Sequence, residues 1–165
     1  MDSKKVVKKI FRNTTGNIDS ILIRNESETI IDKNFFYVTG LKKGLFENSI
    51  AILFPDGEIK LIVSALEAGI AKETFHDVFI YKNHSDYKDI LKEILKNSKT
   101  IGINYSAITL NFYETLKNMS YRKEYVDVSE SLIKTRRIKE NFELDIIKKA
   151  CKISDKVVKK IPDII

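Results

Sequence analysis

Short apolar runs alternate with helical patterns along most of this chain. Near its start, Val6, Val7 and Ile10 recur at helical spacing with lysines between them, which predicts an amphipathic helix. Helical patterns of this kind cover residues 2–12, 86–96 and 110–119. Runs rich in β-branched and aromatic residues predict strands. These runs cover residues 18–23, 50–54, 59–63, 78–81, 101–103 and 125–128.

The turn chemistry between residues 50–54 and 59–63 predicts a β-hairpin. Pro55 is followed there by Asp56 and Gly57. Glycine tolerates the positive φ angle that a tight turn demands, and proline and aspartate favour turn positions. We therefore expect an antiparallel pair of strands at this point in the chain.

The order of the elements predicts a layered α/β domain. After the hairpin, Ser64 is followed three residues later by Glu67, a pattern typical of a capping box, which predicts a helix through about Lys72. From residue 78 onward, strands alternate with helices of about three turns, a rhythm typical of parallel strands joined by crossovers. Helices should therefore flank a sheet that is mixed, parallel in its later part and antiparallel at the hairpin.

Residues 30–41 are strongly aromatic before they reach a glycine. We expect a short helical turn followed by an extended segment through Phe35 and Tyr37 that stops at Gly40. Beyond Gly40 the sequence becomes cationic. From the residues alone, two interpretations stay open. The segment is either a strand end that packs its aromatic side chains inward before a flexible loop, or a ligand-facing loop, since loops on rigid strands often carry binding residues.

The last part of the chain predicts a helix over residues 141–161 whose apolar side needs a partner surface. Its narrow apolar stripe comprises Ile147, Ala150, Ser154, Val157 or Val158, and Ile161. The opposite face carries Lys148, Lys152 and Lys156. A helix of roughly 30 Å is long for a tail, and its apolar stripe needs cover. We therefore interpret residues 1–133 as one domain and residues 134–165 as a linker and the first helix of another.

Composition and charge narrow the classes of function. The chain has 165 residues, with 29 Lys and Arg against 23 Asp and Glu, a formal net charge of +6. Nucleic-acid binding is disfavoured because the lysines recur on solvated helix faces with acidic residues between them. The start has no continuous apolar segment after its lysines, and no run approaches the roughly 20 residues that span a bilayer. We expect a cytoplasmic protein with neither nucleic acid nor membrane as a partner.

The titratable residues form no recognisable catalytic or metal-binding pattern. His76 and His84 stand eight residues apart, outside any metal-ligand motif. Cys151 has no histidine motif beside it, which favours a packing role over a nucleophilic one. Paired carboxylates such as Asp86 and Asp89 have the spacing of a helix surface. We therefore predict no catalytic residue, no metal ligand and no cofactor within this chain.

Three segments, taken together, match a known domain family. The first is Asn-Phe-Phe-Tyr-Val-Thr-Gly-Leu at residues 34–41, similar to an aromatic-Tyr-x-Thr-Gly signature. The second is Ala-Ile-Leu-Phe-Pro-Asp-Gly at residues 51–57, followed by Ile-Gly-Ile-Asn at residues 101–104. The third runs from Arg137 to Ala150 and looks like a linker and the first helix of a catalytic domain. In this order they resemble the creatinase/prolidase N-terminal domain.

The resemblance implies a sheet of ribonuclease-H-like topology without nuclease activity. It also implies a parent protein of the Xaa-Pro dipeptidase or aminopeptidase P type. In such proteins a C-terminal domain hydrolyses Xaa-Pro bonds with two divalent metal ions, manganese or cobalt, held by two Asp, one His and two Glu. No such five-ligand set is found in this sequence. By this resemblance the chain alone is expected to be inactive, and whether to class it as an enzyme stays open.

The resemblance further implies partners and a candidate site. Family members are commonly homodimers in which loops of one subunit approach the active site of the other. The expected partners are therefore the missing catalytic domain, a second copy of the chain and, in the parent, a proline-containing peptide. The substrate-proximal loop implied by the resemblance consists of Tyr37, Thr39, Gly40, Leu41 and Lys42.

The main alternative is a stand-alone, catalytically inactive module that binds peptides or proteins. The stripe on residues 147–161 discriminates between the two hypotheses. A naturally complete module should bury that stripe, whereas the first helix of a further domain should leave it exposed or satisfy it by self-association.

Overall fold

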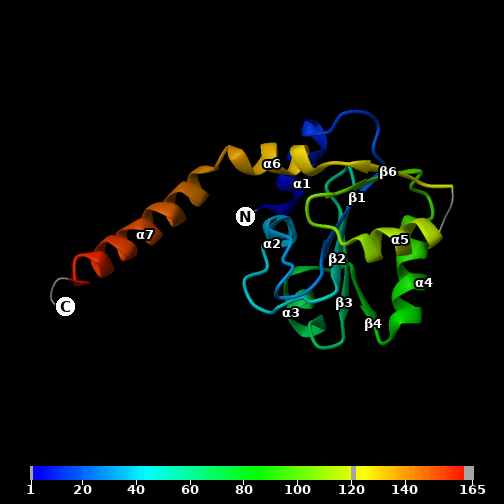
Figure 1. Cartoon of the computed structure of the whole chain (residues 1–165), viewed down its shortest axis with the longest axis horizontal. Coiled ribbons are helices and arrows are strands. Elements are labelled where there is room, and N and C mark those ends of the chain that lie inside the picture. The colour runs from blue at the N-terminus through cyan, green and yellow to red at the C-terminus, as the bar shows by residue number, and fades with distance from the viewer. Residues whose placement is uncertain (1, 120–121, 162–165) are drawn as a thin grey trace. The chain divides into compact units, whose positions relative to one another are not determined.

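Six strands form one mixed sheet with helices on both faces (Figure 1). The computed structural model describes residues 2–119 and 122–161. The strands are β1 (Ser20–Asn25), β2 (Ser49–Leu53), β3 (Ile59–Ser64), β4 (Val78–Tyr81), β5 (Thr100–Ile103) and β6 (Glu124–Asp127). The helices are α1 (Ser3–Asn13), α2 (Lys33–Thr39), α3 (Ala68–Thr74), α4 (His84–Leu95), α5 (Leu110–Met119), α6 (Ser129–Arg137) and α7 (Asn141–Val158). The expected α/β fold class is confirmed.

The strand order is β4-β3-β2-β1-β5-β6. The predicted hairpin is confirmed, because β2 pairs antiparallel with β3 and places Leu53 opposite Ile59. β2 also runs antiparallel to β1, whereas β3 with β4, β1 with β5, and β5 with β6 are parallel. The carboxyl ends of β1, β3, β4, β5 and β6 therefore meet at one edge of the sheet, the edge where open α/β sheets usually bind ligands.

Alternating side chains on the central strands divide the core into two layers. Ile21 and Ile23 of β1 pack with α1, α2, α3 and α6, whereas Leu22 between them packs with α4 and α5. All three are buried. Burying one such side chain contributes roughly 1.5–3 kcal/mol to the free energy of unfolding. The apolar faces predicted for α1 and α4 are the ones that cover the sheet.

A carboxylate joins β1 to its parallel neighbour at the opposite edge. Asp19 Oδ2 accepts the backbone N–H groups of Lys99 at 2.7 Å and Thr100 at 2.9 Å. These hydrogen bonds, the one from Thr100 first, hold the pKa of Asp19 below its ordinary value of 3.8. The carboxylate therefore stays charged, and keeps this junction intact, into mildly acidic solution.

The aromatic segment after Asp32 is helix α2, and the expected extended segment is wrong. Asp32 caps the helix by accepting a first-turn N–H. Gly40 ends it in the left-handed conformation, with φ 68°, and donates its own N–H to the Phe36 carbonyl at 2.9 Å. Phe35 and Val38, three residues apart, are both fully buried. The continuous aromatic run concealed the helical spacing of Phe35 and Val38. The caps at Asp32 and Gly40 set the two ends of the helix.

The capping box expected at the start of α3 is also wrong, although the helix itself is present. The backbone N–H of Glu67 bonds to the Ser64 carbonyl at 3.2 Å, but the Glu67 side chain forms no cap hydrogen bond. Its carboxylate instead accepts the N–H groups of Leu45 and Phe46, which come from a loop more than twenty residues earlier. A tertiary contact has displaced the local one.

Two helices follow the sheet, and the chain divides into two compact units, residues 1–135 and 136–165. The sequence patterns did not predict α6, which contributes Leu132 to the first unit's core. α7 confirms the predicted late helix, and the N–H of Glu140 at its start donates to the Glu143 carboxylate at 2.8 Å. None of the α7 residues is buried.

Candidate functional site

The five residues of the expected substrate-proximal loop lie at the end of α2. Tyr37 is half-buried against the core, and Thr39 and Leu41 are buried. The Thr39 hydroxyl donates to the carbonyl four residues earlier at 2.8 Å, and Gly40 forms the C-cap. Lys42 alone of the five is exposed. The structure thus brings the five together along the chain, and four of them support the helix end that presents Lys42.

The loop from Gly40 to β2 is held in a strained conformation. Phe46 and Asn48 have positive φ angles of 51° and 53°, which are uncommon for residues with a side chain. Glu67 accepts the N–H of Phe46 at 2.9 Å. The amide of Asn25 donates to the carbonyls of Leu45 and Phe46 at 2.8 and 3.0 Å. Buried groups therefore fix both sides of this backbone.

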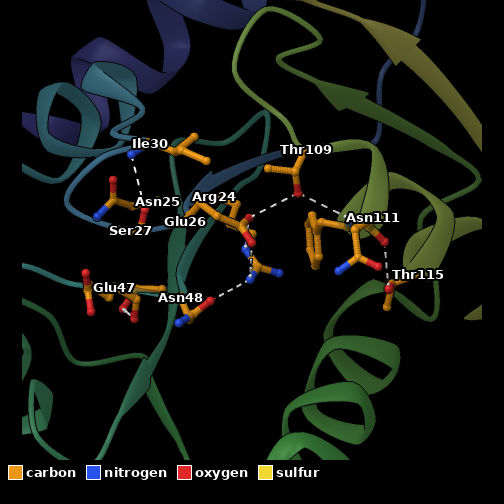
Figure 2. Close-up of polar contacts among 12 residues, drawn as sticks. Arg24, Asn25, Glu26, Ser27, Ile30, Glu47, Asn48, Thr109, Asn111 and Thr115 are labelled. Atoms are coloured by element: carbon orange, nitrogen blue, oxygen red, sulfur yellow. Dashed lines mark hydrogen bonds and ion pairs between the residues drawn. The ribbon is translucent and has the colours of Figure 1, made fainter.

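A second group of side chains, the Arg24 cluster, lies where β1 ends (Figure 2). It consists of Arg24, Glu26, Asn48, Tyr87 and Phe112. The guanidinium pairs with both Glu26 oxygens, at 2.7 Å from Nε and 3.0 Å from Nη2. Nη2 also donates to Asn48 Oδ1 at 2.7 Å and Nη1 to the Tyr87 hydroxyl at 3.0 Å. The Phe112 ring lies under the guanidinium carbon, 4.1 Å from its centroid.

The Arg24 cluster ties the strained loop to the sheet and to α4. Arg24 and Glu26 expose only 12% and 21% of their side chains, so this bidentate ion pair is screened far less than a surface pair. Burial raises the pKa of Tyr87 well above its usual value of 10, although the nearby guanidinium opposes that shift. Tyr87 is therefore a neutral phenol at physiological pH.

Reasoning from sequence patterns did not identify the Arg24 cluster. The one local signal was Arg24 and Glu26 at i, i+2 near a strand end, which places both side chains on one face. The other partners come from residues 48, 87 and 112, so that their approach depends on the whole sheet.

The other residues considered as catalytic or metal-binding candidates are His76, His84 and Cys151. His76 and Cys151 are exposed, and the side chain of His84 lies outside the described structure. Within residues 2–119 and 122–161, no group of three His, Cys, Asp or Glu side chains is placed to hold a metal ion. Over the same ranges, no helix is long and apolar enough to cross a membrane.

Comparisons with known proteins agree with this fold. The sequence profile of the creatinase/prolidase N-terminal domain matches residues 8–138. The chain belongs to this family. A Pyrococcus horikoshii protein named Xaa-Pro dipeptidase is 31% identical over 159 residues, which cover 94% of this chain and 40% of that protein.

Solved structures show the same arrangement. The prolidase from Pyrococcus horikoshii superposes with a TM-score of 0.74 and 27% identity, over 99% of this chain and 43% of that one. The creatinase/prolidase N-terminal domain of an Xaa-Pro dipeptidase from Streptococcus pyogenes superposes with a TM-score of 0.58 and 18% identity, over 76% of this chain and 94% of that one. The chain spans only 30–40% of the length of the curated relatives that it matches.

Proposed function

We propose that this chain is the N-terminal, non-catalytic part of an Xaa-Pro dipeptidase or aminopeptidase P. The observation that carries the proposal is the family match, together with a relative named Xaa-Pro dipeptidase that aligns along nearly all of the chain. In this proposal a following domain hydrolyses the Xaa-Pro bond with two divalent ions, manganese or cobalt, which activate water. Among residues 2–119 and 122–161, no three His, Cys, Asp or Glu side chains are grouped as such ions would require.

The exposed apolar face of α7 supports a division into residues 1–133, the domain, and residues 134–165, a linker and the first helix of the catalytic domain. Ile147 and Val158, which lie on the predicted stripe, expose 45% and 61% of their surface. Apolar side chains in such a row are normally covered by a partner surface. We expect a complete stand-alone binding module to bury these side chains, and the first helix of a further domain to pack them against that domain.

A hydrolysis assay tests this proposal directly. Residues 1–165, supplied with Mn²⁺ or Co²⁺ and an Xaa-Pro dipeptide, should release no proline above the rate without protein. The complete natural protein should release proline in a metal-dependent way under the same conditions. Metal-dependent proline release by residues 1–165 alone would overturn the assignment of this chain as non-catalytic. An inactive complete protein would favour the binding-module alternative.

We further propose that the domain contributes to a homodimer and that the end of α2 faces the partner's active site. Two observations support this role for the segment comprising Tyr37, Thr39, Gly40, Leu41 and Lys42. Buried hydrogen bonds fix the backbone on both sides of the turn, and the side chain that it presents to solvent is cationic. An ammonium group carried by a fixed backbone is suited to attract the terminal carboxylate of a dipeptide.

In the complete protein, Lys42→Glu should therefore raise KM for dipeptides roughly two- to fivefold, the range that about 0.5–1 kcal/mol of exposed charge contact allows. The dimer should persist in size-exclusion chromatography. Lys92→Glu changes an exposed lysine on α4 that pairs with Asp89 at 4.0 Å. This variant is the matched control and should leave KM unchanged. If Lys42→Glu keeps the KM of the unmodified protein, as Lys92→Glu should, and the dimer is intact, the loop has no role in substrate access.

A further inference from the structure

A cavity of about 490 Å³ lies between the C-terminal ends of α4 and α5. These two helices cover the same face of the sheet (Figure 1). β5 and β6 begin beside the cavity, so it lies at the edge of the sheet opposite to the Arg24 cluster. Its volume is within the usual range for small-molecule sites.

The inner part of this cavity is apolar. Leu91, Leu95 and Leu116 belong to the core layer under the two helices and form its floor. Met119 and Tyr125 are only half-buried and keep apolar surface that a ligand would cover. The Tyr125 hydroxyl donates to the Leu116 carbonyl at 2.8 Å, which fixes the position of the ring. The flexible thioether of Met119 adapts to the shape of an apolar group. The floor therefore suits a short alkyl chain.

The rim of the cavity carries charge of one sign. Its charged residues are all basic, among them Lys96, Lys99, Arg122 and Lys123. None of the lining residues within 2–119 and 122–161 is Asp or Glu, although the whole chain has 23 Asp and Glu against 29 Lys and Arg. A group that complements this rim must be an anion.

Neighbouring carboxylates do not occupy the rim. Lys96 pairs with Glu93 three residues earlier on α4, and both side chains are exposed. An exposed pair of this kind is weak, so a bound anion can replace the contact with Glu93. Asp19 Oδ2 already accepts the backbone N–H groups of Lys99 and Thr100 at the start of β5. The positive charge of the rim is therefore available to a ligand.

Lys123 is half-buried, whereas Lys96, Lys99 and Arg122 are exposed. Its ammonium group donates to the carbonyls of Leu95 and, at 2.7 Å, Ser98, where it meets the negative end of the α4 dipole. Burial lowers the pKa of Lys123, and the Asp19 carboxylate opposes that shift. An ammonium group has three N–H donors, and these two carbonyls engage two of them. The third donor can bind an anion in the cavity.

We propose that this cavity binds a small amphiphilic anion, a carboxylate with a single alkyl chain of medium length. The alkyl chain covers Met119 and the Tyr125 ring, while the carboxylate meets the ammonium groups at the rim. The basic rim determines the charge of the ligand, and the apolar floor determines its chain. This binding does not depend on the proposed peptidase role, because it uses no metal and no residue of a following domain.

Nuclear magnetic resonance can test the proposal on the intact 165-residue chain. The chain contains two methionines, so selective methyl labelling gives a simple spectrum in which Met119 reports on the cavity. The exposed apolar side chains of α7 also attract alkyl chains, and for this reason binding is followed at Met119. The probe is octanoate. Octanamide, its neutral isostere, and acetate, its head group alone, serve for comparison at constant ionic strength.

Octanoate should shift the Met119 methyl signal saturably. Its dissociation constant should be about tenfold or more below that of acetate, a difference that the burial of two methylene groups is enough to produce. Octanamide should bind more weakly than octanoate because it brings no charge to the rim. Absence of a saturable shift would refute the site. Equal affinity for acetate or for octanamide would refute an amphiphilic anion as its ligand.

Two double variants test the basic rim. Lys96→Gln combined with Lys99→Gln removes two cations from the lining, so octanoate binding should weaken about fivefold or more. Lys8→Gln combined with Lys72→Gln removes the same charge from exposed positions on α1 and α3, which cover the other face, and should change the affinity by less than about twofold. Unchanged thermal unfolding verifies the fold of both variants. Equal affinities of the two double variants would overturn the proposal.

The titration of Lys123 gives a readout that does not depend on these variants. Bound octanoate should raise the pKa of Lys123, because a nearby anion stabilises the ammonium form that burial disfavours. Carbon NMR of the Lys123 Cε atom as a function of pH, with and without saturating octanoate, measures this change. An unaltered pKa would show that the carboxylate binds away from Lys123 and would refute the proposed orientation of the ligand.

Discussion

Replacing Asp32 with alanine should lower the free energy of unfolding by about 4 kcal/mol, the combined effect of losing a helix cap and orphaning buried amides. Asp32 is 3% exposed, and Oδ1 accepts both the backbone and the side-chain N–H of Asn34 at 2.8 Å. Oδ2 accepts from the Asn104 amide at 2.8 Å, which joins the start of α2 to the end of β5. Urea unfolding followed by circular dichroism measures the loss.

Asp2→Ala is the matched control for this variant. Asp2 caps α1 with the same chemistry, accepting the N–H of Lys5 at 3.2 Å, but it lies in solvent. Its removal should lower the free energy of unfolding by about 1 kcal/mol or less, since water replaces the lost acceptor. If both substitutions have equal effects, burial of the Asp32 network contributes nothing.

A second substitution at Asn104 checks the origin of the effect. Once Asp32 is alanine, Asn104→Ala removes an amide that is already unpaired, so the double variant should lose less stability than the sum of the two single variants. Strict additivity would show that the hydrogen bond between Asp32 and Asn104 is not the source of the stability.

Sequence patterns predicted correctly those helices and strands whose structure depends mainly on their own residues. The β2–β3 hairpin follows from a turn of Pro55, Asp56 and Gly57 between two apolar runs, and the structure confirms it. α4 follows from apolar residues at helical spacing, and Tyr87 and Leu91 are buried on that face. The resemblance carried by residues 34–41, 51–57 and 101–104 is confirmed by the family match over residues 8–138, whereas the segment from Arg137 to Ala150 lies almost entirely beyond that match.

Elsewhere the deciding contact lies far away in the sequence. Glu67 stands three residues after Ser64, the spacing of a capping box. Its carboxylate instead accepts hydrogen bonds from two backbone N–H groups of a distant loop. The sequence of α2 contains typical helix caps in Asp32 and Gly40, but its aromatic run fits a strand equally well. The packing of α2 against α1, β1 and β2 agrees with these caps and decides for the helix, and no local pattern contains that packing.

The candidate site divides in the same way. The aromatic-Tyr-x-Thr-Gly pattern located a real structural feature, the capped end of α2 at residues 37–42, while its access to substrate stays a prediction. The Arg24 cluster needs residues from β1, α4, α5 and the loop before β2 at once. Such sites follow from sheet order, and sheet order comes from the whole hydrophobic pattern, not from a motif.

Glu67→Ala should lower the free energy of unfolding by about 3 kcal/mol, because it leaves two backbone N–H groups without an acceptor in a loop that cannot rearrange easily. Glu67 is 8% exposed, and its Oε1 atom lies 3.1 and 2.9 Å from the nitrogens of Leu45 and Phe46. Phe46 holds a positive φ of 51° with its ring fully buried, so the carboxylate opposes a backbone strain. Glu67→Gln keeps an acceptor oxygen and should lose only about 1 kcal/mol. Glu73→Ala, an exposed position on the same helix, should change stability by less than about 0.5 kcal/mol.

Gly44 provides an independent test of the same contact. Its φ is 87°, and a Cβ atom there would lie 2.5 Å from Glu67 Oε2 and 2.8 Å from the Phe46 ring. Gly44→Ala should therefore destabilise the chain by about 2 kcal/mol, part from the positive φ and part from displacing the carboxylate. In the Glu67→Ala background the second part disappears, so the two effects should fall short of additivity by about 1 kcal/mol. Additive effects would mean that the carboxylate and the loop are energetically independent, contrary to the two hydrogen bonds between them.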